Sequence, residues 1–232
     1  MTSELSPEIH RAISVPRLGK YLALVGNSSL EDALLLYRLN AKLSGTFIFP
    51  LQSMEVALRN ALASQLDAYF GASDWLINPA IPFDHRVWSG RQIEKIQKAT
   101  SRLQEGKRRP PTQNDMISDL ELGFWTELVD KTDGRHRLWS CIKGAFPNLP
   151  PPAKRGPVFF ALNRLRKLRN RIAHHEPIVG PAANPIDAHS LAIAVIGWIS
   201  RDKAAWTQKY SQVGEVWKEI SDEKHDRGWL GF

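Results

Sequence analysis

The stretch that decides the fold of this chain reads PVFFALNRLRKLRNRIAHHEP and covers residues 157–177. At 100° per residue on a helix, its main apolar side chains share one stripe, which an amphipathic helix buries against a core. These side chains are Val158, Ala161, Leu162, Leu165 and Ile172. Pro177 cannot continue a helix, so the chain is expected to leave it after Glu176. We therefore predict an amphipathic helix over residues 157–175.

Arg169 lies in the middle of this apolar stripe. A guanidinium that faces a core or a partner needs an anionic or hydrogen-bonding match, because an unpaired buried charge costs several kcal/mol. His174 lies four residues after Asn170, so their side chains are neighbours on a helix. The helix C-terminus near His174 and His175 favours positive charge. Arginine binds phosphate and histidine transfers protons near neutral pH, so these residues predict a site that handles phosphodiesters.

The rest of the chain also follows helical patterns. Ser28 and Glu31 form a capping box for a helix that reaches about residue 44. We expect residues 47–49 to be an apolar connector and Pro50 to open a second long helix, which reaches residue 70. Further helices are expected over residues 16–25, 84–105, 187–201 and 203–219. The sequence contains no sustained strand alternation and no internal repeat, so the prediction is an all-α fold in one domain.

The composition is that of an ordinary globular protein, with 232 residues of which 43% are hydrophobic, so extensive disorder is not expected. The longest apolar stretch, residues 191–199, is too short to cross a bilayer, and the chain shows no signal-peptide pattern. Cys141 is the only cysteine, which excludes an internal disulfide and is typical of a reducing compartment. We therefore expect a cytoplasmic protein without a membrane partner.

Lysine and arginine outnumber aspartate and glutamate by 31 to 24, a formal net charge of +7 at pH 7. Such an excess favours polyanionic partners. The basic side chains gather before a proline pair at residues 110–111 and on the predicted helix over residues 157–175. They include Lys107, Arg108, Arg109, Arg164, Lys167 and Arg171. A charged loop and a solvated helix face would explain the same distribution, whereas together with the phosphodiester-handling residues it predicts an RNA-binding surface.

Four residues separate Arg169 from His174 in the uninterrupted run LRNRIAHHEPI, residues 168–178. This run resembles the signature of the HEPN superfamily of helical ribonucleases, and more closely that of its Abi-like branch, which acts in abortive infection. Residues 54–60, MEVALRN, and residues 119–125, DLELGFW, resemble further segments of the same branch. The likeness therefore extends over most of the chain, apart from about the last fifty residues.

The resemblance implies a fold as well as an activity. It implies a HEPN-like helical bundle with additional helices, in one domain over residues 1–232. The core helices would cover about residues 28–70 and 115–200, with peripheral helices toward both termini. Trp125, in the segment that precedes the basic helix, is expected to serve packing, because large aromatic side chains in helical chains usually fill the core.

Cleavage of RNA without a metal ion needs a base for the ribose 2′-OH, an acid for the 5′ leaving oxygen and a cation for the phosphate. One motif supplies part of this set, whereas two motifs across a two-fold interface supply all of it. The resemblance likewise implies a homodimer with a composite, cofactor-free endoribonuclease site. Arg169 would stabilise the phosphate, Asn170 would orient it or the histidine, and His174 would be the general acid or base. His175 and Glu176 match the Abi-like extension and would support the site.

Residues 54–60 add a second candidate element. Glu55 and Arg59 are four residues apart on the expected helix and can pair on one face. As a surface pair they would matter little, whereas facing inward they could orient the motif residues. Glu55, Arg59 and Asn60 are therefore candidate supporting residues.

The resemblance suggests the role of a toxin-like effector of phage defence, which halts growth by degrading RNA and is restrained by an antitoxin or a regulatory RNA. Metal-dependent hydrolysis is the enzymatic alternative. It is disfavoured because His174, His175 and Glu176 diverge by about 100° per residue on a helix and lack metal-ligand spacing. The other alternative is a non-catalytic HEPN-type module that binds RNA or a partner protein.

Overall fold

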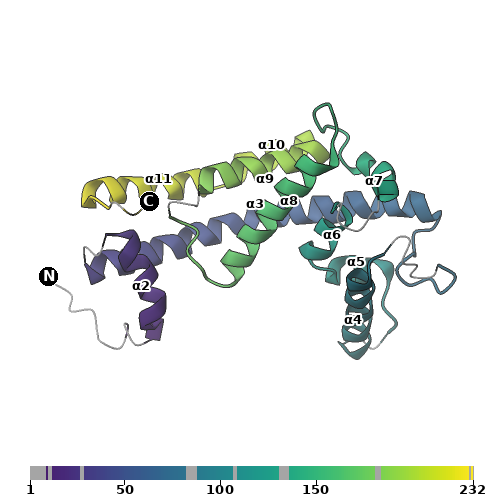
Figure 1. The fold of residues 1–232 in the computed structure, drawn as a ribbon, viewed down its shortest axis with the longest axis horizontal. Helices are drawn as coiled ribbons and strands as arrows, with labels where there is room; N and C mark the ends of the chain where they lie inside the picture. The colour runs from purple at the N-terminus through teal and green to yellow at the C-terminus, as the bar shows by residue number, and fades with distance from the viewer. Residues whose placement is uncertain are drawn as a thin grey trace.

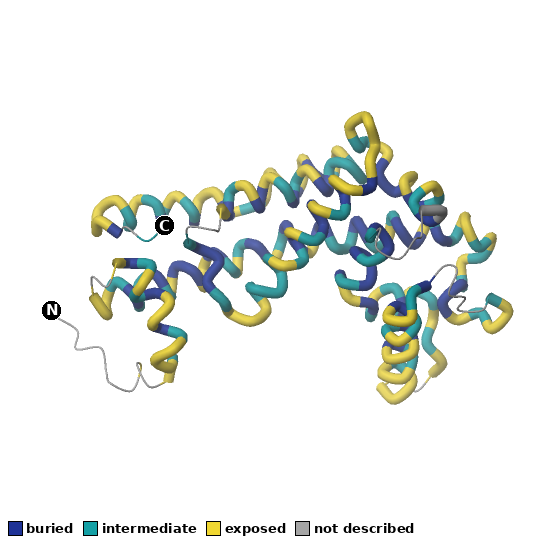
Figure 2. The backbone as a smooth tube through the Cα atoms, viewed as in Figure 1, coloured by how far each residue is buried: buried dark blue, intermediate teal, exposed yellow. Residues whose placement is uncertain are grey.

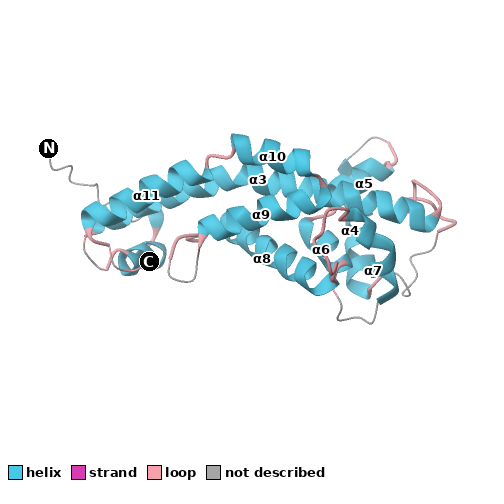
Figure 3. Ribbon diagram, turned by 90° about the horizontal axis from the view of Figure 1, so that it is seen from above, coloured by secondary structure: helices cyan, strands magenta, loops and turns pink. Residues whose placement is uncertain are grey.

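The computed structural model describes residue 9 and residues 12–26, 29–81, 88–106, 109–130, 136–180, 184–229 and 231. Over these residues the chain forms helices and loops and no strand, which confirms the predicted all-α class (Figure 3). The helices are α2 (Val15–Leu24), α3 (Leu30–Phe70), α4 (Gly90–Gly106), α5 (Gln113–Asp119), α6 (Leu122–Leu128), α7 (His136–Ile142), the 3-10 turn η1 (Lys143–Ala145), α8 (Arg155–Ala173), α9 (Pro185–Ile199), α10 (Arg201–Tyr210) and α11 (Val213–Arg227). Within the described ranges, no helix has both the length and the apolar composition needed to cross a membrane.

Helix α3 runs along the long axis of the molecule, and most of the other helices pack along it (Figure 1). α9 and α11 pack beside α3, α10 packs on α9, and α2 packs against the N-terminal half of α3. α8 crosses α3 obliquely and packs mainly on α9 and α6. The chain that follows α8 returns to the N-terminal half of α3, where Ile178 and Asn40 share a hydrogen bond.

Strong capping signals begin and end α3. Ser29 is the N-cap, and its hydroxyl accepts a hydrogen bond from the backbone N–H of Asp32 at 3.0 Å. Glu31 and Asp32 place negative charge in the first turn, where the helix dipole favours it. Gly71 ends the helix in the left-handed conformation, with φ 66, which glycine adopts without strain. The observed cap lies one residue after the predicted Ser28, which is outside the described residues.

The predicted connector at residues 47–49 is wrong, because α3 runs without interruption through Pro50. A proline inside a helix removes one backbone hydrogen bond and costs about 3 kcal/mol. The apolar stripe of α3, however, stays in phase on both sides of this proline. Its buried positions are Leu36, Leu39, Leu43, Phe47, Leu51, Met54, Leu58, Leu62 and Leu66. Burying one such side chain contributes about 1.5–3 kcal/mol, so packing on both sides outweighs the proline penalty.

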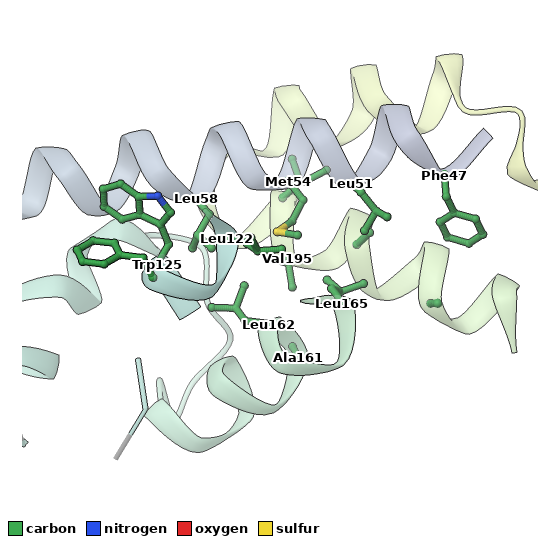
Figure 4. Packing of buried hydrophobic residues seen from close by; sticks show 14 of the residues in the cluster. Phe47, Leu51, Met54, Leu58, Leu122, Trp125, Ala161, Leu162, Leu165 and Val195 are labelled. Carbon is green, nitrogen blue, oxygen red and sulfur yellow. The ribbon is translucent and has the colours of Figure 1, made fainter. Parts of the chain in front are cut away.

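The core includes the region where α3, α8 and α9 meet. Figure 4 shows Leu51 of α3, Leu165 of α8 and Val195 of α9 as members of one hydrophobic cluster, and all three are buried. Figure 2 shows buried residues along the length of α3 and many exposed residues on α4. Trp125 of α6 is fully buried, as predicted, and its indole N–H donates to the carbonyl of Leu120 at 3.1 Å. The segment over residues 119–125 therefore serves packing.

The predicted helix over residues 203–219 is two helices in the structure, α10 and α11. Ser211 between them has an extended backbone, with φ −79 and ψ 130. Ala204 and Thr207 are the buried residues of α10, whereas the large aromatic side chains of Trp206 and Tyr210 are exposed. After the break, α11 instead buries Val213 in its first turn. The buried residues of α11 therefore start a new helical phase after the break. The amphipathic pattern of the whole segment did not show this change of phase.

Candidate functional site

α8 ends two residues earlier than predicted, in a turn that separates the two histidines of the motif. His174 is the C-cap residue, and His175 follows in the left-handed conformation with φ 54. The backbone N–H of His175 donates to the carbonyl of Ile172 at 3.0 Å, and that of Glu176 donates to the carbonyl of Arg171 at 2.8 Å. This pair of bonds is a Schellman motif, which satisfies the last carbonyl groups of a helix. The side chains of the two histidines therefore do not lie on one helical face.

His175 stands where glycine is the usual residue. The left-handed conformation costs a residue with a side chain roughly 1 kcal/mol or more relative to glycine. Such backbone strain is concentrated at functional sites, where a requirement for the side chain offsets it. The φ of 54 at His175 therefore favours a role for its imidazole.

Asn40 of α3 holds the segment that follows this turn. Its side chain is buried, with 3% of the residue exposed. The Oδ1 atom accepts a hydrogen bond from the backbone N–H of Ile178 at 2.7 Å, and the Nδ2 group donates to the hydroxyl of Tyr21 at 3.0 Å. One buried amide thus connects α3, α2 and the chain after the motif.

Arg171 binds the same turn. Its guanidinium donates to the carbonyl of Pro177, and its Nε lies 3.7 Å from Oε2 of Glu176. Because both side chains are partly exposed, this ion pair adds little to stability. Arg171, predicted to contact RNA, and Glu176, predicted to support the site, are therefore engaged in shaping the chain around the histidines.

A groove of about 720 Å³ lies between α3 and the last turn of α8. Its lining residues on α3 recur every three or four residues from Tyr37 to Arg59, which is one face of the helix. Twenty-two steps of about 1.5 Å make this face roughly 33 Å long. Much of the lining is apolar or small, and Ile48 within it is 60% exposed. The volume is typical of a ligand site, and the length suits an extended ligand.

Two guanidinium groups, one carboxylate and one imidazole line this groove. Arg169 and His175 come from the α8 side, and Glu55 and Arg59 come from α3. The expected pair of Glu55 with Arg59 is not formed, and in the described part of the chain neither Arg59 nor Arg169 has a carboxylate within ion-pair distance. Arg59 makes only a long hydrogen bond, 3.5 Å, to the carbonyl of Ser118, and its Nε has no partner among the described residues. Both cations are therefore available to an anionic ligand.

Two of the three predicted catalytic residues are not among the residues that line the groove. His174 is exposed and Asn170 is partly exposed. Asn60, predicted as a supporting residue, is exposed on α3 and is also not part of the lining. The motif is thus divided, with Arg169 and His175 lining the groove and Asn170 and His174 outside its lining.

The predicted RNA-binding cluster is partly described. Lys107 and Arg108 lie outside the described residues. Arg109 is paired with Asp115, with 2.9 Å between Nη1 and Oδ2. Arg164 and Lys167 are exposed on the face of α8 opposite its buried stripe, as the helical pattern predicts. These two cations are therefore available to a polyanion.

Asn40 and Tyr21 are functional candidates that no motif indicated. Burial raises the pKa of Tyr21 from 10.0 to about 12, with Tyr37 adding to the rise and the cations Arg17 and Arg171 opposing it. The hydroxyl of Tyr21 therefore stays protonated at neutral pH and accepts the hydrogen bond from Asn40. A sequence signal existed for Asn40, because it is a polar residue in an apolar stripe of leucines, and such residues usually have a specific partner.

Over the described residues, no group of three or more histidine, cysteine, aspartate or glutamate side chains is arranged to hold a metal ion. Comparisons of the chain with protein-family models, curated proteins and solved structures give no match. The function of the chain is therefore inferred from the chemistry of the groove and of the motif residues that line it.

Proposed function

We propose that the chain is a metal-independent endoribonuclease of the HEPN type, which cleaves RNA at a composite site formed by two copies. The groove carries this proposal, because Arg169 from the last turn of α8 and His175 from the turn after it line the same groove as Arg59. Guanidinium groups bind phosphate in bidentate fashion, and imidazole transfers protons near neutral pH. The resemblance of residues 168–178 to the Abi-like signature supports the same activity.

In the proposed reaction, Arg169 binds the non-bridging oxygens of the scissile phosphate. One histidine removes the proton from the ribose 2′-OH, and the 2′ oxygen attacks phosphorus. The bond from phosphorus to the 5′ oxygen breaks, and a second histidine donates a proton to that oxygen. The products are a 2′,3′-cyclic phosphate and a 5′-hydroxyl. Negative charge grows on the phosphate in the transition state, so the arginine contributes most there.

The position of His174 outside the groove lining supports a composite site in a homodimer. Within one protomer His175 lines the groove with Arg169, whereas His174 is exposed beside it. In a two-fold interface, residue i of one copy contacts residue j of the other and the reverse, so a residue beside one groove can contact the groove of the other copy. The partner subunit's His174 would then complete the groove, and with His175 it supplies the two proton transfers.

The biological role that follows is a toxin-like effector of phage defence, held inactive by an antitoxin or a regulatory RNA. Expression of the active protein alone should arrest growth, and Arg169→Ala should relieve the arrest. Relief by His174→Ala as well would connect the arrest to proton transfer rather than to RNA binding.

The test of the activity is incubation of purified protein with total RNA, with and without EDTA. The wild type should cut in both conditions and leave 2′,3′-cyclic ends. Arg169→Ala, His174→Ala and His175→Ala should each lower the rate by about 10²-fold or more. His225→Ala, which removes an exposed histidine at the end of α11, is the matched control and should cut normally. Cleavage that EDTA abolishes, or that survives all three site variants, would contradict the proposal.

A mixing experiment tests the composite site separately. Arg169→Ala and His174→Ala are each inactive alone, but a heterodimer of the two contains one site with an intact arginine and an intact partner histidine. Mixing them should therefore restore part of the activity. A site contained within one protomer predicts no restoration, because every protomer in the mixture carries one defect.

The position of His174 outside the groove of its own protomer favours a second candidate, a non-catalytic RNA-binding module. This module would bind single-stranded RNA in an Arg169-dependent manner and leave it intact. Binding without cleavage, and growth arrest that His174→Ala does not relieve, would decide for the module.

A further inference from the structure

Glu55 is the residue of the groove that a phosphate site does not explain. Its carboxylate repels a phosphate, and it forms no ion pair with Arg59 although the two lie four residues apart on one helix. The neighbouring lining residues Leu51 and Val56 are apolar. A carboxylate beside apolar walls is satisfied by ligand N–H donors, and apolar walls suit the faces of a planar ring.

We propose that this end of the groove binds a guanine base of single-stranded RNA, with Glu55 and Arg59 forming hydrogen bonds to its edges and the partly exposed Val56 contacting its ring. The inference rests on the proposed nuclease function and adds a base preference to it. Arg169, from the facing helix, then holds a phosphate of the same strand.

Guanine is the base whose hydrogen-bonding edges match both side chains. Its Watson–Crick edge presents two adjacent donors, the N1–H and N2–H groups, which a carboxylate accepts in bidentate fashion. Its Hoogsteen edge presents the O6 and N7 acceptors, which a guanidinium binds in bidentate fashion. Adenine and cytosine present a donor beside an acceptor to the carboxylate, and uracil flanks its one donor with two carbonyl groups. An acceptor opposite a carboxylate is left unpaired and repelled, so these bases bind more weakly.

The helix geometry suits such a contact. Four residues along α3 separate Glu55 from Arg59 by about 6 Å, which lies within the reach of both side chains around one purine. The guanidinium is not held by a strong bond, since its contact with the carbonyl of Ser118 is 3.5 Å long. The groove continues past Gly45, where a side chain would meet nothing within 4 Å, so neighbouring nucleotides have space.

The binding test uses nucleotides that differ by single hydrogen-bonding groups. Titrations of the wild type with 5′-GMP, AMP, CMP and UMP, followed by calorimetry, should show GMP binding about tenfold more tightly than the others. IMP lacks the N2 amino group that Glu55 reads, and 7-deaza-GMP lacks the N7 atom that Arg59 reads. Both should bind more weakly than GMP.

Two variants test which residue causes the weaker binding of IMP and which causes the weaker binding of 7-deaza-GMP. Glu55→Gln should abolish the difference between GMP and IMP. Arg59→Met, which has no hydrogen-bond donor, should abolish the difference between GMP and 7-deaza-GMP. Glu105→Gln removes one negative charge from an exposed position on α4 and should leave every preference unchanged. These differences are ratios measured within one protein, so a partly unfolded variant does not mimic them. Equal binding of all four nucleotides by the wild type would overturn the inference.

Cleavage of random-sequence RNA distinguishes this inference from the proposed function. A guanine preference in binding without any cleavage would support the base site and contradict the nuclease. Cleavage without a preference for guanine near the cut, together with equal nucleotide binding, would support the nuclease and contradict the base site. If both proposals hold, the cuts should cluster at one fixed distance from guanine, and Glu55→Gln should scatter them.

Discussion

Replacement of Asn40 by alanine tests whether one buried amide positions the motif turn. In the wild type, the backbone N–H of Ile178 donates to Oδ1 of Asn40 at 2.7 Å, and Nδ2 of Asn40 donates to the hydroxyl of Tyr21 at 3.0 Å. Alanine removes both of these hydrogen bonds. An orphaned buried donor costs about 1–3 kcal/mol, and the lost bond to a hydroxyl that is still able to donate costs about 0.5–1.5 kcal/mol. Asn40→Ala should therefore lower the free energy of unfolding by about 1.5–4.5 kcal/mol.

Urea denaturation followed by circular dichroism measures this loss. Asn60→Ala on the same helix is the matched control, because Asn60 is exposed, and alanine there should change stability by less than about 0.5 kcal/mol. RNA cleavage by Asn40→Ala, assayed at a temperature well below the melting temperature of the variant, should also fall. The hydrogen bond that holds the chain just after the two histidines is lost in this variant. A stability loss no larger than that of the control would show that the Asn40 amide does not hold the segment after α8.

Three further outcomes are expected. Pro50→Ala should raise the free energy of unfolding by about 1–2 kcal/mol, because a backbone hydrogen bond of α3 returns while some buried surface is lost; an unchanged urea midpoint would argue against a strained proline. His175→Gly should raise the free energy of unfolding by roughly 1 kcal/mol and yet lower the rate of RNA cleavage. A drop in melting temperature would contradict the strain expected of a left-handed histidine. Burial lowers the pKa of His189 below 6.5, so the unfolded chain takes up a proton before the folded one. The free energy of unfolding should therefore fall as the pH drops through 6.5, and His189→Gln should show a smaller fall in paired urea titrations at about pH 7.5 and 5.5.

Local pattern accounted for much of the fold. The apolar stripe at residues 157–175 became α8, and the apolar run at residues 187–201 became α9, because each segment has one buried face in one helical phase. The prediction was wrong where the apolar residues continued one helical phase through a proline, which usually ends or begins a helix. Pro50 indicated a helix start, but burial on both sides of it carried α3 through.

The sequence also predicted some residues of the candidate site and missed the position of others. Arg169 drew attention because a cation in an apolar stripe needs a partner, and it lies in the groove. Glu55 and Arg59 also lie there, although not as the pair that their spacing allows. His175 took the place expected of His174, because helical periodicity does not specify a left-handed turn at the helix end.

The sequence alone was enough to predict the helical class, most of the buried face of α8 and the residue types able to handle a phosphate. Helical class and buried face depend on spacings of three and four residues, which can be read within a short segment of the sequence. Only the tertiary structure decided that α3 continues through Pro50, that His175 enters the groove, and that Asn40 holds Ile178 across 138 positions of sequence. These outcomes depend on the free energy of contacts between distant segments, and no local spacing contains that information.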